Sequence, residues 1–90
     1  MASQSATAQR LVERLNERAA INGRMYQTHR RISEREHGQG QHETAQMHRR
    51  IAQNHAVLRK LDRLVIEDML ALCAELGINV RLVQKETERE

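Results

Sequence analysis

The feature that most constrains the fold is a heptad repeat that runs without a break from residue 44 to residue 76. Its members are separated alternately by four and three residues, and they are Thr44, His48, Ile51, His55, Leu58, Asp62, Val65, Met69, Leu72 and Leu76. This period places them on one side of a long α-helix, where they can pack against a neighbouring helix by knobs-into-holes contacts. We therefore predict a helix over residues 42–76.

A second stripe with the same spacing lies earlier in the chain. Its members are Ala8, Leu11, Leu15, Met25, His29 and Ile32, with Arg18 and Asn22 as polar members. This stripe predicts a helix over residues 5–36. Asn22-Gly23 is a turn signal that could break the helix, whereas one glycine inside a continuous helix costs only about 1 kcal/mol. We favour the continuous helix and keep the break as the alternative.

The segment at residues 37–41 separates the two predicted helices. Gly38 and Gly40 together disfavour helix by roughly 2 kcal/mol. Helices of similar length joined by a short turn pack antiparallel. Because Tyr26 is the only aromatic residue, the core has to be a narrow aliphatic seam. We predict an all-α, antiparallel two-helix hairpin that forms a single helical domain over residues 1–90.

The end of the chain follows a helix-stop pattern. Gly77 suits the left-handed backbone that often ends a helix, and Ile78 can fold back as the hydrophobic contact of such a stop. Ile78, Val80 and Leu82 then alternate with polar residues, which is a strand pattern. We predict an extended tail over residues 77–90, either paired with another chain as a strand or packed on the helices through Ile78 and Val80.

The second half of the second predicted helix is apolar on more than one side. A helix that packs on one neighbour needs only an apolar stripe, so this segment needs cover on a further side. We predict a homodimer with a four-helix core. Its predicted interface residues are Leu58, Leu64, Val65, Met69, Leu72 and Leu76. The alternatives are a different partner protein, or a third helix made by a break at Asn22-Gly23.

The polar residues match no known catalytic pattern. The chain has no nucleophile–base pair, phosphate-binding loop or zinc-ligand spacing, so we predict no enzyme, no cofactor and no metal site. His29, His48 and His55 occupy predicted seam positions, where polar residues can set the register of two helices. Their protonation near pH 6.5 would loosen the seam. With Cys73 as the lone cysteine and no segment near the ~20 apolar residues of a membrane span, we expect a cytoplasmic protein with no membrane partner.

Two pairs of arginines flank the predicted turn from opposite helices. They are Arg30, Arg31, Arg49 and Arg50, in a chain of net charge +3. We predict that these four residues form one basic patch for a partner or for phosphate groups. The patch keeps open the alternative of a small basic nucleic-acid-binding accessory protein. A structural assembly component is a further alternative.

Two short stretches resemble a known family. Thr28-His29-Arg30-Arg31-Ile32 with Glu34, then a glycine-containing turn, and a second helix closing on Leu76-Gly77-Ile78 are similar to the small helical quorum-sensing antiactivators of conjugative plasmids. The resemblance implies a dimeric helical hairpin that inhibits a DNA-binding transcriptional activator by contact. We therefore expect a non-enzymatic protein–protein interaction module that acts as a regulator.

Overall fold

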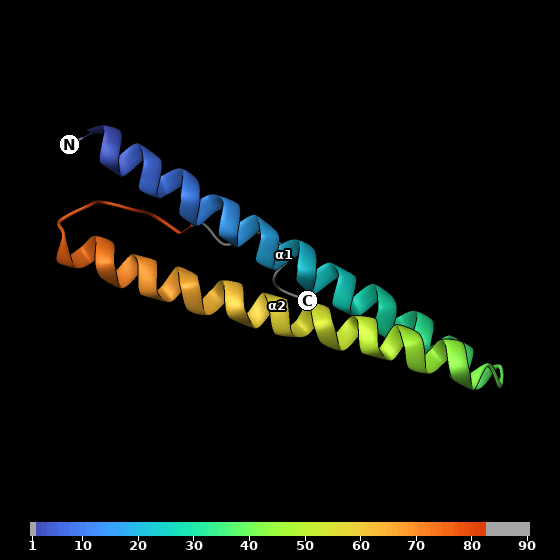
Figure 1. The fold of residues 1–90 in the computed structure, drawn as a ribbon. Helices are drawn as coiled ribbons and strands as arrows, with labels where there is room; N and C mark the ends of the chain where they lie inside the picture. The colour runs from blue at the N-terminus through green and yellow to red at the C-terminus, as the bar shows by residue number, and fades with distance from the viewer. Residues whose placement is uncertain (1, 83–90) are drawn as a thin grey trace.

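The computed structural model describes residues 2–82, which form two long helices joined by a tight turn (Figure 1). Helix α1 spans Ala2–Gly38 and helix α2 spans His42–Glu75. They run antiparallel along the long axis of a molecule that measures 58 × 19 × 16 Å. Residues 2–82 contain no strand. The predicted all-α hairpin is confirmed.

Helix α1 passes through Asn22-Gly23 without a break, so these residues do not start a third helix. Both residues are buried. A Cβ atom on Gly23 would lie 3.2 Å from Nε of Arg59, which is closer than an ordinary van der Waals contact. The glycine therefore lets the Arg59 side chain of α2 lie against the backbone of α1, and this close approach explains a glycine in the helix interior.

Both helices end in the same glycine-dependent cap. After α1, Gly40 has a φ of +78°. Its N–H donates to the carbonyl of His37, and the N–H of Gln41 donates to the carbonyl of Glu36. After α2, Gly77 has a φ of +71°, and the corresponding bonds run from Gly77 to Ala74 and from Ile78 to Cys73. These are Schellman motifs, and the predicted stop at Gly77 is confirmed.

The helices meet along a line of buried and half-buried residues that we call the seam. On both helices its members are spaced alternately by three and four residues. The α1 members are Ser5, Ala8, Val12, Leu15, Ala19, Asn22, Tyr26, His29, Ser33 and Glu36. The α2 members are Ala45, His48, Ala52, His55, Arg59, Asp62, Ile66, Met69 and Cys73. Most members are small or polar, so the two backbones approach closely.

The predicted heptad of α2 coincides with the seam at only four positions, which are His48, His55, Asp62 and Met69. The other predicted members up to Leu72 lie one residue before a seam residue, and Leu58, Val65 and Leu72 are about half exposed. The stripe of α1 is displaced in the same way, with Leu11 and Met25 beside the seam. The predicted stripes follow the largest aliphatic residues, whereas the seam contains the small residues next to them.

The chain after α2 turns back and crosses to α1 (Figure 1). Residues 78–82 form no strand, and Ile78 and Val80 are half-buried. The side-chain amide of Gln9 holds this segment, because its Nε2 donates to the carbonyl of Arg81 at 2.7 Å and its Oε1 accepts from the N–H of Arg81 at 2.8 Å. The predicted extended tail therefore packs on the helices as far as residue 82, and residues 83–90 lie outside the described residues.

The two glycines of the turn give a matched test of the first cap. No side chain lies within 4 Å of a Cβ atom added at Gly38 or at Gly40, so only backbone conformation separates them. Gly40→Ala should destabilise the fold by about 1–2 kcal/mol because its φ is positive. Gly38→Ala should stabilise it by about 0.5–1 kcal/mol. Thermal unfolding followed by circular dichroism measures both, and equal effects would contradict the cap.

Candidate interaction surfaces

The centre of the seam contains a salt bridge between the two helices. Asp62 on α2 is buried, with 6% of its side chain exposed, and its carboxylate accepts two hydrogen bonds from Arg18 on α1. The bonds are 2.6 Å from Nη2 and 3.1 Å from Nε. The hydrogen bond to Asp62, and then its negative charge, raise the pKa of Arg18. The paired guanidinium compensates for the burial of the carboxylate.

Between this salt bridge and the turn, the seam is a ladder of hydrogen bonds that includes three histidines. Nδ1 of His55 lies 2.8 Å from Oδ1 of Asn22, and Nδ1 of His29 lies 2.8 Å from Nδ1 of His48. The ring of His29 stacks on those of His48 and His55, with centroids 5.1 and 6.0 Å away. The bond between two Nδ1 atoms needs one donor and one acceptor, so the His29–His48 pair cannot be doubly protonated and keep it.

A carboxylate lies at the turn end of this ladder. Oε1 of Glu36 is 3.6 Å from Nε2 of His48. That oxygen is buried, and within residues 2–82 it has no hydrogen-bond partner. Nε2 of His48 is thus directed toward the buried carboxylate, while its Nδ1 shares a hydrogen bond with His29. Two rings that both carried an Nδ1–H could not keep this bond between the helices.

The described residues contain no group of three or more His, Cys, Asp or Glu side chains that could hold a metal ion. The thiol of Cys73 is buried in the seam.

These contacts predict that the fold loses stability on acidification at pH values above those at which carboxylates titrate. Burial lowers the pKa of His29, and the charges of His48 and His55 lower it further. Because the folded pKa lies below the unfolded value of about 6.5, stability should be greatest above that pH. It should fall as pH decreases from about 6.5 toward the folded pKa, by at most about 1.4 kcal/mol per pH unit for one proton, and level off below the folded pKa.

Chemical denaturation between pH 7.5 and 5.5 measures this dependence. His29→Gln should reduce it. His42→Gln is the matched control, because His42 is exposed at the turn, outside the ladder, and its Nδ1 lies 3.1 Å from Nδ1 of His37. An equal reduction in both variants would show that the ladder is not the source.

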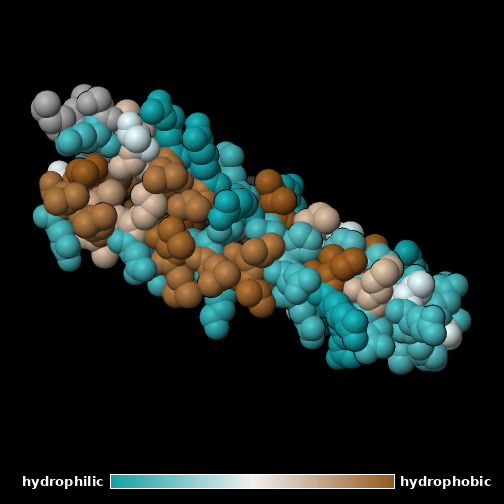
Figure 2. Space-filling model, viewed as in Figure 1, coloured by the Kyte–Doolittle hydropathy of each residue, from teal (hydrophilic) through white to brown (hydrophobic). Residues whose placement is uncertain are grey.

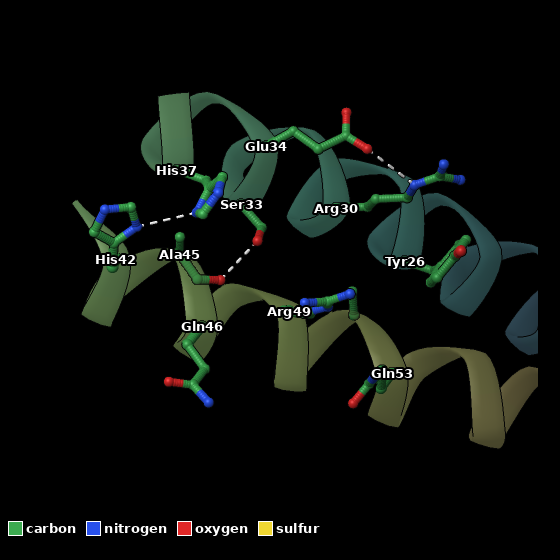
Figure 3. Close-up of a pocket in the computed structure, with 11 residues that line it drawn as sticks. Tyr26, Arg30, Ser33, Glu34, His37, His42, Ala45, Gln46, Arg49 and Gln53 are labelled. Carbon is green, nitrogen blue, oxygen red and sulfur yellow. Dashed lines mark hydrogen bonds and ion pairs between the residues drawn. The ribbon is translucent and has the colours of Figure 1, made fainter. Parts of the chain in front are cut away.

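A groove of about 870 Å³ opens between the helices near the turn (Figure 3). Arg30 lines it from α1 and Arg49 from α2, and the side chain of Arg49 lies between the two helices. Tyr26 also lines it, while Arg30 forms an ion pair with Glu34 at 3.2 Å. The four arginines predicted to form one patch are thus divided: Arg30 and Arg49 share this groove, whereas Arg31 and Arg50 are exposed and absent from its lining.

Large aliphatic side chains are exposed mainly in the half of the hairpin that contains the chain ends, whereas the turn half is mostly hydrophilic in the view of Figure 2. Of the predicted interface residues, five are 45% to 65% exposed: Leu58, Leu64, Val65, Leu72 and Leu76. Met69 is half-buried in the seam instead. The prediction considered only α2 and omitted three exposed residues of α1, which are Leu11, Ile21 and Met25. The signal for two of them, Leu11 and Met25, was their place in the apolar stripe predicted for residues 5–36.

The molecule exposes more surface than a compact monomer of its mass. Its accessible surface is 6815 Å², against about 5,400 Å² expected for 10.5 kDa. Its radius of gyration is 17.1 Å, against about 12 Å for a compact domain of this length. The excess area, about 1,400 Å², is larger than the ~800 Å² that each partner buries in a standard interface.

No known protein family, curated protein or solved structure matches this chain. Neither helix within residues 2–82 is long and apolar enough to cross a membrane. The surfaces described above are therefore the basis for a functional proposal.

Proposed function

We propose that this chain is a non-enzymatic helical protein–protein interaction module that forms a homodimer and regulates another protein by occupying its surface. The observation that carries the proposal is the set of leucines and valines left exposed beside the seam. Large exposed apolar patches on a protein mark association surfaces. The excess of accessible area over a compact monomer supports the same conclusion.

The proposed mode of action is inhibition by contact. The resemblance of residues 28–34 and 76–78 to antiactivators implies that the regulated partner is a DNA-binding transcriptional activator. A rigid hairpin suits this role, because its helices present continuous surfaces tens of ångströms long. Helix packing in an apolar groove is a common mode of protein recognition, and it needs no chemical step.

The first test is the oligomeric state of the intact chain and of Leu72→Asp. The wild type should have a mass of about 2 × 10.5 = 21 kDa by sedimentation equilibrium at micromolar concentration. Leu72 is 53% exposed, so an aspartate there is tolerated in a single hairpin but is costly in an apolar interface. Leu72→Asp should therefore be mostly monomeric or unfolded. Ala71→Asp introduces the same charge at the next exposed position and should remain dimeric.

A second measurement distinguishes dissociation from unfolding. For a dimer, the thermal midpoint rises with protein concentration by mass action, and this dependence should be weaker in Leu72→Asp. A wild type that is a well-folded 10.5 kDa monomer at micromolar concentration, with a midpoint independent of concentration, would refute the proposed self-association.

The groove with Arg30 and Arg49 favours a second candidate function, the binding of nucleic acid through phosphate groups. This candidate predicts that the double variant Arg30→Gln/Arg49→Gln binds duplex DNA more weakly. It also predicts a shallower slope of log K against log[salt], by nearly one unit for each phosphate that is no longer neutralised. Arg31→Gln/Arg50→Gln removes the same charge outside the groove and should have a smaller effect. Fluorescence anisotropy over a salt range of about 50–200 mM measures both, and undetectable binding of the wild type would exclude this candidate.

A further inference from the structure

Both helices carry exposed aliphatic residues along the same flank of the seam, among them Leu11 and Met25 on α1 and Leu58, Val65 and Leu72 on α2. Neighbouring seam residues on each helix are separated by three and four residues in turn. Where two of them are four residues apart, the residue just before the second one lies at one flank of the seam. On α1 these residues are Leu11, Arg18, Met25 and Ile32, and on α2 they are Ile51, Leu58, Val65 and Leu72. Because the helices wind in the same sense and run in opposite directions, these two flanks are adjacent. We call the eight residues the apolar face.

The position of the groove supports this assignment. Arg30 and Arg49 each directly follow a seam histidine, His29 and His48, and therefore lie on the opposite flank of their helices. Both line the groove, and none of the eight residues of the apolar face does. The hairpin thus has a basic groove near the turn on one side and the apolar face on the other.

Seven of the eight residues of the apolar face are aliphatic, and the eighth, Arg18, is paired in place. Its guanidinium donates to both carboxylate oxygens of Asp62 in the seam, so the local charge is already neutralised. Such a pair can be covered by another apolar surface at far lower cost than an unpaired arginine.

We infer that a second copy of this chain packs on the apolar face, face to face, to form a four-helix bundle to which both helices of each copy contribute. The inference rests on the proposed self-association and specifies its surface. The molecule as a whole exposes about 1,400 Å² more than a compact monomer of its mass, and a standard interface buries ~800 Å² per partner. A symmetric dimer uses the same patch on both copies, as a face shared by two antiparallel helices allows.

This geometry differs from an interface on α2 alone. Met25 of α1 belongs to the contact, whereas Leu64 of α2 lies on the outer edge of its helix, six residues after Leu58, and does not. The two side chains are similarly exposed in the single hairpin, at 36% and 47%. They therefore form a matched pair for a test.

The test compares Met25→Glu with Leu64→Glu by sedimentation equilibrium of the full chain. Met25→Glu should raise the dimer dissociation constant by about 100-fold or more, because it buries an unpaired charge. Leu64→Glu should change it by less than about threefold, because the new carboxylate remains in water. The reverse order of effects would overturn the inferred face.

A second measurement does not depend on whether the variants with an added charge fold. In a Cys73→Ala background shown to dimerise, single cysteines replace Met25 or Leu64, and their reaction with a maleimide is timed at increasing protein concentration. At concentrations where about nine-tenths of the chains are dimeric, Met25→Cys should react about tenfold more slowly, following the monomer fraction. Leu64→Cys should keep its rate. Protection of Leu64→Cys but not Met25→Cys would reject the face while leaving self-association intact, and a monomeric wild type would reject both.

Discussion

The close approach of two helices along a narrow seam is the constraint on which the rest of the structure depends. Ala19 and Ala52 are buried in the seam, and Gly23 leaves room for the Arg59 side chain against the backbone of α1. Among the described residues, Val12 is the largest side chain that is fully buried. Apart from Leu15, the leucines of residues 2–82 lie outside the seam, and many of them are about half exposed. The fold and the exposure of these leucines have the same cause.

The polar layers of the seam determine which positions of the two helices face each other. Arg18 with Asp62, Asn22 with His55 and His29 with His48 each join one residue of α1 to one of α2. A change of register would separate these pairs, and a buried polar group left without a partner costs about 1–3 kcal/mol. An aliphatic seam would be more stable but would fix the register less strictly, as polar residues in coiled coils illustrate. Near the turn, the hairpin thus depends on hydrogen bonds more than on apolar burial.

The parts of the fold that depend on local chemistry could be predicted from the sequence. The glycine stop after α2, the turn at residues 37–41 and the two helices all follow from backbone preferences and heptad spacing. Which residues of each helix face the other helix could be predicted only in part. His48, His55, Asp62 and Met69 lie in the seam as expected, whereas Leu58, Val65 and Leu72 lie beside it. Hydrophobic periodicity shows on which side of a helix the apolar side chains are concentrated. That side includes the residues that contact the other helix and any residues that contact another molecule. A single sequence does not separate the two contributions.

The same distinction applies to the arginines. Neighbouring residues on a helix point about 100° apart, so Arg30-Arg31 and Arg49-Arg50 cannot all line one surface. The residue that joins the groove in each pair is the one that follows a seam histidine, and that choice becomes predictable only after the seam has been located. If two copies associate through their apolar faces, the groove of each copy remains on the outer side of the bundle. A ligand of the groove could then bind the dimer without displacing either copy.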